Sequence, residues 1–384
     1  MERSFFTSKS PGRAIRGKKN RWAFYPDPLP SEINAEWQIS EALAEAERVA
    51  GRLEGQLAGL MRPHKPFRSI FLFQGAFSAF TLENTKISID DHFLSIMSEN
   101  DGGNGSSDPI SLYCKAYDAG LEYLDKNLPP SLDLILQIYR QIFQSDTVSK
   151  GVQEGFREKT GDPVNLFGLS GEEFQYVPPP ESLMKTALYS FDKRFRQEIK
   201  LPTLVDISLI FYQFMAIQPL SGGNMATACL LSDLLLATSL ETKSIPVSVA
   251  PFISKNKGDC ANRFFHLIKT GDWGDWISFF LRGMAWEFAK ARQTVSAVTA
   301  LREDYRKRLE GERVSAALAQ LADDIFINPV ITVNYASKLA RVTFRAAQLN
   351  VDKLLDLGIL KETTGQRRNR IYTAPDVLQI YDKR

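Results

Sequence analysis

The feature that most constrains this chain is a pair of apolar helix-forming segments joined by a short glycine-containing loop. The first segment ends near Ile217, the loop QPLSGGN covers Gln218–Asn224, and the second helix begins at about Met225. Such a loop presents free backbone N–H groups at a helix N-terminus, which is an anion-binding geometry. A purely structural turn is the other interpretation of the same residues. The pattern therefore predicts a helix–loop–helix and leaves both interpretations open.

Apolar residues recur at helical spacing along most of the chain before residue 330, so the main body is predicted to be all-α. The expected helices cover 31–60, 69–82, 86–97, 110–126, 131–144, 181–195, 202–216, 225–240, 259–269 and 274–308. Few strands are expected in this part. The segment Tyr176–Pro180 can open with a short strand, which its prolines then end.

Composition limits the kind of partner and the compartment. The net charge is only +2 over 384 residues, so a nucleic-acid site would have to be a local patch. The three cysteines, Cys114, Cys229 and Cys260, are far apart and form no Cys/His cluster, which argues against a disulfide framework or a zinc site and fits a reducing cytoplasm. No uncharged apolar run approaches ~18 residues, so neither a transmembrane helix nor membrane association is expected. The basic N-terminus lacks the apolar part of a secretory signal.

Four regions are expected along the chain. Residues 1–21 are predicted to be a disordered basic arm, because Arg13–Arg21 is rich in charge and poor in apolar residues. A solubilising tail is favoured there over a nucleic-acid arm. An N-terminal helical region (22–109) and a helical core (110–308) follow. A change of composition near residue 308 begins a C-terminal domain (309–384).

The central loop resembles the active-site motif of the Fic family, HPFx(D/E)GNGRxxR. Laid along that motif, Gln218 stands at the histidine, Pro219 at the proline, Leu220 at the phenylalanine, Gly222 at the acidic residue, Gly223 and Asn224 at the first Gly-Asn pair, Met225 at the next glycine, and Ala226 and Cys229 at the two arginines.

Further segments occur in the family's order, and the resemblance extends over most of the chain. Gly155–Glu158 resembles an upstream G-x-F-R segment that is one residue longer. Phe174–Leu183, which includes Tyr176 and Val177, resembles the flap that positions a target segment by strand pairing. Gly271–Leu281 resembles a downstream helix signature, and PDPLP (26–30) a proline-rich N-terminal segment. The resemblance implies a mainly α fold, a Fic-like helical domain with N-terminal helices.

Family members with the intact motif transfer a nucleotidyl group, usually AMP from ATP, to a protein hydroxyl. The histidine acts as general base, the acidic residue holds Mg²⁺, and the arginines bind phosphate. Gln218 cannot accept a proton near neutral pH, and Gly222 and Ala226 have no functional side chain. The sequence therefore indicates a catalytically degenerate, regulatory member that needs no metal or other cofactor. The alternative is a divergent protein adenylyltransferase that uses ATP, Mg²⁺ and another base.

The three histidines of the chain do not replace that base. His64 is expected in a loop, His92 near a helix start, and His266 on an apolar helix as a packed core or surface residue.

An inhibitory helix of the family carries the pattern (S/T)xxxE(G/N), whose glutamate pairs with the final motif arginine. Thr81–Asp91 resembles that element, with Glu83 and Asn84 at its last two positions, although Ala79 replaces the Ser/Thr. Cys229 stands where the arginine should be. Glu83 is therefore interpreted as a relic, with a solvated helix-end glutamate as the alternative.

The C-terminal segment is predicted to be a winged helix-turn-helix domain, which makes this domain α+β. A helix over Glu312–Pro329 and the β-prone VITV lead into two short helices that begin at Asn334 and Thr343, and a hairpin with a basic turn follows. The order resembles winged-helix domains at the C-terminus of many Fic proteins.

DNA is the favoured partner of this domain. The candidate contacts are Arg341, Arg345 and Gln348 on or before the second helix, and Arg367, Arg368 and Arg370 in the wing. Residues 311–384 carry eleven Lys/Arg and eight Asp/Glu, a difference of only +3, so protein contacts or dimerisation are the alternative. The expected protein is thus a cytoplasmic, bacterial, DNA-binding regulator. A protein partner at the flap and a homodimer are further expectations.

Overall fold

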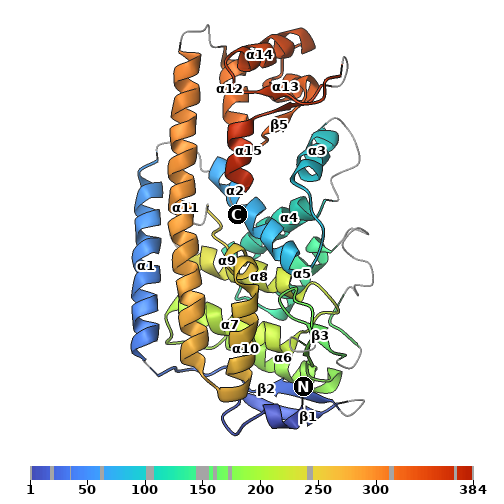
Figure 1. Cartoon of the computed structure of the whole chain (residues 1–384), viewed down its shortest axis with the longest axis vertical. Coiled ribbons are helices and arrows are strands. Elements are labelled where there is room, and N and C mark those ends of the chain that lie inside the picture. Colours follow the sequence, from blue (N-terminus) through green and yellow to red (C-terminus); the bar gives the residue numbers. More distant parts are fainter. Residues whose placement is uncertain are drawn as a thin grey trace.

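The computed structural model describes residues 2–17, 21–34, 36–60, 65–100, 108–143, 155–158, 162–171, 175–239, 245–310, 315–366 and 370–382. The molecule is elongated, with the N-terminal strands at one end, a helical body in the middle and the C-terminal domain at the other end (Figure 1). Within the described ranges, no helix is both long and apolar enough to cross a membrane.

Eleven α-helices that the structure describes precede residue 310, and they confirm that the body is mainly helical. Their bounds are α1 Trp37–Ala58, α2 Lys65–Leu82, α3 Ile89–Asn100, α4 Pro109–Asp125, α5 Leu132–Ile142, α6 Glu181–Arg194, α7 Thr203–Ile217, α8 Asn224–Ser239, α9 Ala250–Lys255, α10 Lys257–Thr270 and α11 Trp273–Leu309. The first helix begins at Trp37 and not at Ser31. The short helix α9 was not predicted, because six residues are too few to show a helical period.

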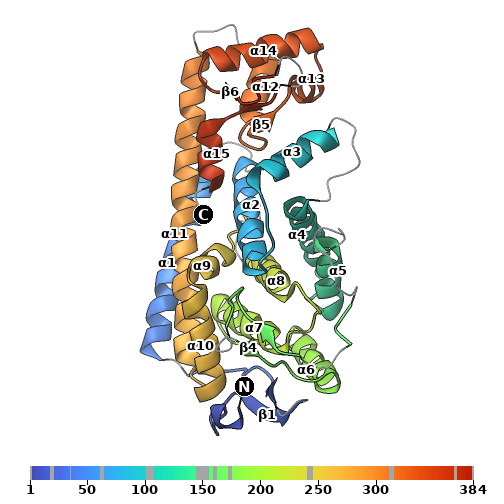
Figure 2. The same ribbon diagram turned by 45° about the vertical axis from the view of Figure 1, so that its right-hand side comes forward.

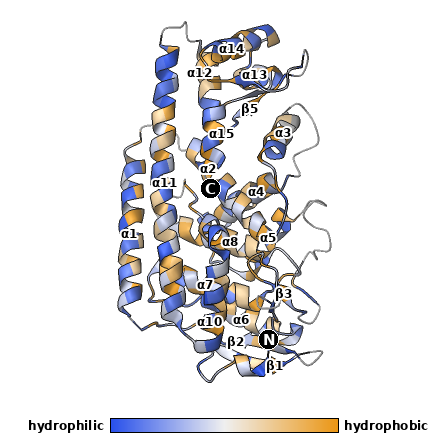
Figure 3. Cartoon of the chain, in the orientation of Figure 1, coloured by the Kyte–Doolittle hydropathy of each residue, from blue (hydrophilic) through white to orange (hydrophobic). Residues whose placement is uncertain are grey.

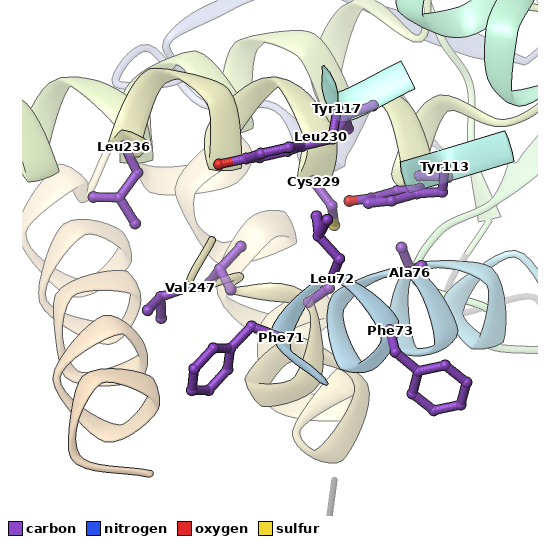
Figure 4. Packing of buried hydrophobic residues seen from close by; sticks show 14 of the residues in the cluster. Phe71, Leu72, Phe73, Ala76, Tyr113, Tyr117, Cys229, Leu230, Leu236 and Val247 are labelled. Atoms are coloured by element: carbon purple, nitrogen blue, oxygen red, sulfur yellow. The ribbon is translucent and has the colours of Figure 1, made fainter. Parts of the chain in front are cut away.

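The centre of the body is built on α7 and α8, whose residues are buried almost all the way round. Helices that are apolar on every face need neighbours on every face. Helix α2 packs against α8 from one side, and α4 packs beside both. Leu72 of α2, Tyr113 of α4 and Cys229 of α8 lie close together in this layer (Figure 4). The central loop therefore connects two helices that are themselves buried in the core.

Helix α11 is 37 residues long and runs along one side of the molecule beside α1 (Figures 1 and 2). At 1.5 Å per residue it spans about 55 Å. Helix α1 turns a stripe of small and aliphatic residues toward it, including Ala46, Val49 and Leu53, and exposes its charged face (Figure 3). The stripe follows the three- and four-residue spacing of an amphipathic helix.

The prediction of a disordered arm at 1–21 is wrong for the residues that the structure describes. Strand β1 (Gly12–Arg16) pairs antiparallel with β2 (Trp22–Pro26). Arg13 lies over the ring of Tyr25 at 5.0 Å and Arg3 over Trp22 at 5.4 Å, so basic residues of the arm stack on aromatic rings. Phe24 is fully buried and anchors the hairpin to the body.

The C-terminal region contains α12 (Ala316–Asp324), β5 (Val330–Ile331), α13 (Val333–Ala340), α14 (Phe344–Asp356), β6 (Lys361–Glu362), β7 (Tyr372–Thr373) and α15 (Pro375–Asp382). The three strands form an antiparallel sheet in the order β5–β7–β6. Arg341 takes a left-handed conformation (φ 52°) in the tight turn between α13 and α14. Strands and helices therefore follow the predicted order up to β7.

Helix α15, which was not predicted, joins this region to the body. Tyr381 packs edge-on against Phe73 of α2 and Phe93 of α3, with ring centroids 5.2 Å apart in both pairs. The side-chain amide of Gln74 donates to the Ile380 carbonyl at 3.0 Å.

Candidate functional site

The loop after α7 is fixed by its own hydrogen bonds. Gln218 ends α7 in a left-handed conformation (φ 47°, ψ 61°), and its N–H donates to the Phe214 carbonyl at 2.9 Å. Asn224, the first residue of α8, accepts from the Leu220 N–H at 3.0 Å and donates to the Leu220 carbonyl at 2.9 Å. This reciprocal pair closes the loop with hydrogen bonds between its own residues.

Glu83 occupies the N-terminus of α8. Its carboxylate accepts hydrogen bonds from the backbone N–H groups of Met225 (2.7 Å) and Ala226 (3.2 Å). Burial raises the pKa of the Glu83 carboxyl, while hydrogen bonds from Ala226, Met225 and Gly223 oppose that rise. A helix N-terminus is a site where anions bind, and here a carboxyl group of the protein itself occupies it. This contact could not be predicted from the sequence, because Glu83 bonds to backbone N–H groups, which every residue except proline has.

The space where a Gly223 side chain would lie is filled by an aromatic ring. Gly223 has a φ of +71°, and a Cβ at this position would lie 2.1 Å from Cζ of Phe143, the residue that ends α5. One turn earlier in α5, Tyr139 is hydrogen-bonded to the side chain of Ser221. The aromatic end of α5 therefore covers the glycine side of the loop.

Arg157 ties the loop to the flap. Its Nε donates to the Gln218 carbonyl at 2.7 Å, its Nη2 donates to the Pro179 carbonyl at 2.5 Å, and its N–H donates to the Pro219 carbonyl at 2.9 Å. Burial lowers the pKa of Arg157 to about 10, which still leaves the guanidinium charged at neutral pH. The guanidinium group donates to backbone carbonyls of the loop and the flap, so the role of Arg157 here is structural.

The predicted flap residues face the protein interior. Strands β3 (Val164–Asn165) and β4 (Gln175–Tyr176) form a short antiparallel hairpin. The Tyr176 hydroxyl donates to the Ala216 carbonyl of α7, and the Val177 carbonyl accepts from the Phe24 N–H at 3.0 Å. Both side chains are buried. Tyr176 and Val177 therefore hold the flap against α7 and β2.

A cavity of about 370 Å³ lies between the loop and the flap, within the size range of small-molecule sites. Its polar walls include Glu83, Arg157, Asp162 and Gln218. The Gln218 amide nitrogen donates to the Met215 carbonyl at 3.1 Å, which turns the side chain back toward α7. No group of three or more His, Cys, Asp or Glu side chains that could hold a metal ion occurs in the part of the chain that the structure describes.

Other predicted positions lie away from this cavity. Ala226 and Cys229 are fully buried, and Cys229 packs in the core between α8, α2 and α4 (Figure 4). His92 is buried in α3, where its Nδ1 lies 2.9 Å from the Asp108 carboxylate. His266 is on α10, about half exposed, with its Nε2 3.6 Å from Asp272. Asn84 is exposed and left-handed (φ 57°) just after α2, and His64 lies outside the described residues.

The predicted DNA contacts are only partly described. Arg341 and Arg345 are exposed, and neither forms an ion pair with another described residue. The Gln348 side-chain amide donates to Asp352 at 2.7 Å within α14. Arg370 is exposed, and its Nε donates to the Gln366 carbonyl at 3.0 Å. Arg367 and Arg368 lie outside the described residues.

Comparison with known proteins identifies the fold. No protein-family model matches the sequence. A Fic family protein from Desulfovibrio desulfuricans G20 superposes with a TM-score of 0.54 at 15% identity, over 91% of this chain and 98% of that one. Fic-1 from C. elegans gives a TM-score of 0.46 at 15% identity, over 68% of this chain and 73% of that one.

A Fic-domain-containing signaling protein from Bacteroides thetaiotaomicron VPI-5482 gives a TM-score of 0.47 at 15% identity, over 66% of this chain and 95% of that one. The match to the Desulfovibrio protein, which spans nearly the whole of both chains, shows that this chain has the Fic fold.

Proposed function

We propose that this protein is a catalytically degenerate member of the Fic family that works as a DNA-binding regulator. The observation that carries the first half is the position of Glu83, whose carboxylate occupies the backbone amides at the start of α8. In a phosphate-binding loop those amides would contact the anion. A ligand phosphate would have to displace a carboxylate that belongs to the protein.

No described side chain of the cavity clearly takes over the roles of the missing motif residues. Gln218 is at the base position, and an amide accepts no proton near neutral pH. Arg157, the described cation of the cavity wall, already donates to the Gln218 and Pro179 carbonyls. An alternative base would have to be a carboxylate. Besides Glu83, Asp162 is the described acidic residue that lines the cavity.

The test is a transfer assay with ATP labelled on the α-phosphate, the full-length protein, Mg²⁺ and a cell lysate. The expected result is no protein labelling above a control without the protein. A divergent transferase would label lysate proteins, and an Asp162→Asn variant would abolish that labelling if Asp162 were its base. Labelling with this dependence would replace the degenerate-enzyme proposal with the alternative enzyme.

The second half of the proposal concerns the region after α11, which we propose to be a winged helix. The element order supports this: α12, β5, α13 and α14 are followed by two strands that pair with each other. The turn at Arg341 sets α13 against α14, as in a helix-turn-helix whose second helix enters the major groove. Exposed arginines lie in that turn (Arg341), at the start of α14 (Arg345) and beside the β6–β7 loop (Arg370).

Duplex binding by the full-length chain tests this half. Selection from a random duplex library, followed by fluorescence anisotropy at several salt concentrations, should give binding that weakens as salt rises. A protein-interaction domain would enrich no sequence and show no such salt dependence.

A further inference from the structure

Helix α14 exposes two large apolar side chains on the surface that the proposed function directs at DNA. Phe344 is 57% exposed and Leu349 is 60% exposed. Ala347, Val351 and Leu354 of the same helix are buried at the three- and four-residue spacing that faces a core. Phe344 begins that row but stays exposed at the start of the helix, and Leu349 lies on the outer face. More than half of each of these two side chains is left uncovered by that packing.

The surroundings of these side chains favour a polyanionic partner. Arg345 follows Phe344 directly, and Arg341 lies one turn before α14. Both are exposed cations without an ion-pair partner among the described residues. Apolar groups flanked by free cations complement a surface that combines phosphates with apolar groups. The major groove of DNA is such a surface, because each thymine carries a C5 methyl group there.

We infer that Phe344 and Leu349 contact thymine methyl groups in the major groove, so that the protein prefers thymine at the positions that these side chains reach. The inference rests on the proposed DNA-binding function. Phe344 is the first residue of α14, and the N-terminal residues of the second helix of a helix-turn-helix are those that reach base edges. Apolar side chains are established partners of the thymine methyl.

A hydrogen bond inside α14 determines which of its polar side chains is available to contact a base. Because the Gln348 amide donates to Asp352 at 2.7 Å, this donor is already engaged on the helix. Arg345 is the free donor on the exposed face, and arginine pairs with guanine. The preferred site is therefore expected to combine a guanine with neighbouring thymines.

The experiment uses the full-length protein and a duplex selected from a random library. Each thymine of the site is replaced in turn by deoxyuridine, which lacks the methyl group and keeps the same hydrogen-bonding edge. Loss of one buried methyl should weaken binding about three- to fivefold, as the burial of one methylene-sized group implies. In Phe344→Ala, the difference between thymine and deoxyuridine should disappear at one position and persist at the others.

The matched control is Tyr189→Ala, which removes another exposed aromatic ring (72% exposed) from α6 in the body. It should leave both affinity and thymine preference unchanged. The salt dependence of binding should be the same in Phe344→Ala and the wild type, because no charge is removed.

Three results would overturn the inference, and they are distinguishable. If no duplex binds, the proposed DNA-binding function fails and the inference fails with it. If a duplex binds with a clear salt dependence but tolerates deoxyuridine everywhere, the inference is wrong and the proposed function stands. If Phe344→Ala converts a dimer into a monomer by light scattering and leaves thymine preference intact, this face is a protein interface.

Discussion

The carboxylate of Glu83 accepts a 2.7 Å hydrogen bond from the backbone N–H of Met225, 142 residues further along the chain. This contact joins the end of α2 to the start of α8. In the family pattern that the sequence resembles, a glutamate pairs with the final motif arginine. Here that position is Cys229, which is buried in the core, and the glutamate pairs with helix amides instead.

Removing the Glu83 carboxylate should destabilise the protein without creating activity. Glu83→Ala leaves the Met225 and Ala226 amides without their acceptor, so the free energy of unfolding should fall by about 1–3 kcal/mol. Glu83→Gln should lose less, because its amide oxygen can still accept. Urea denaturation measures both, and a nucleotide-labelling assay should stay blank. A large gain of labelling in Glu83→Gly would show that the inhibitory contact still restrains a working site.

Enlarging Gly223 should disrupt the loop. The new Cβ in Gly223→Ala would lie 2.1 Å from Cζ of Phe143, and the φ of +71° disfavours alanine. A loss of roughly 2–4 kcal/mol is expected from overpacking and backbone strain together. In the double variant with Phe143→Ala the steric part should be relieved, so its loss should be smaller than the sum of the single losses. Additive losses in thermal or urea unfolding would show that the ring does not press on the loop.

The stability of the protein should fall as pH rises toward the raised pKa of the Asp233 carboxyl. Burial raises the pKa of Asp233 to about 8, even though Tyr113, Ser248 and the Val249 backbone donate to it. Because the folded pKa exceeds the unfolded value of ~3.9, ionisation favours the unfolded chain, and stability is lost as pH increases from about 4 to about 8.

Asp233→Asn should remove this contribution. The urea midpoint should drop less between pH 6 and pH 9 in the variant than in the wild type. Glu287 of α11, whose pKa is also raised by burial, should leave a residual slope in both proteins. Equal drops in the two proteins would refute the assignment to Asp233.

Loss of an arginine near α14 should change the salt dependence of DNA binding. If Arg341 contacts phosphate, Arg341→Ala should weaken binding to all duplexes similarly and lower the slope of log affinity against log salt by about one. If Arg345 contacts a guanine, Arg345→Ala should cost ~1–3 kcal/mol and relax the preference at that base pair. Anisotropy titrations over a series of salt concentrations distinguish the two. Unchanged slopes and preferences in both variants would argue against this surface.

The sequence predicts the helical body well because its helices are either long apolar segments, as in α7 and α8, or carry apolar residues at helical spacing, as in α1 and α5. It does not predict the N-terminal hairpin. The charges of Arg13–Arg21 suggest disorder, whereas the aromatic partners Trp22, Phe24 and Tyr25 come later in the chain. Two of those rings, Phe24 and Tyr25, are buried in the core of the body, which anchors the hairpin.

In the candidate site, too, the sequence does not predict contacts between distant segments of the chain. Residue identities alone show that Gln218, Gly222 and Ala226 lack the functional groups of the motif. They do not show that Glu83 bonds to backbone amides, or that Phe143 fills the space beside Gly223. Both contacts join segments far apart in the chain, and one uses main-chain atoms common to every residue.

The most direct test of the degenerate-enzyme account is transfer of label from α-phosphate-labelled ATP by the wild type, Gln218→Ala and Gln218→His. Restoring histidine at Gln218 returns a base, but it leaves Gly222 without a metal ligand, Ala226 without a guanidinium and Glu83 on the α8 amides. The account therefore predicts no labelling above background from any of the three proteins. Robust labelling by the wild type that persists in Gln218→Ala would contradict it, because the cavity would then hold a catalytic base that the account does not contain.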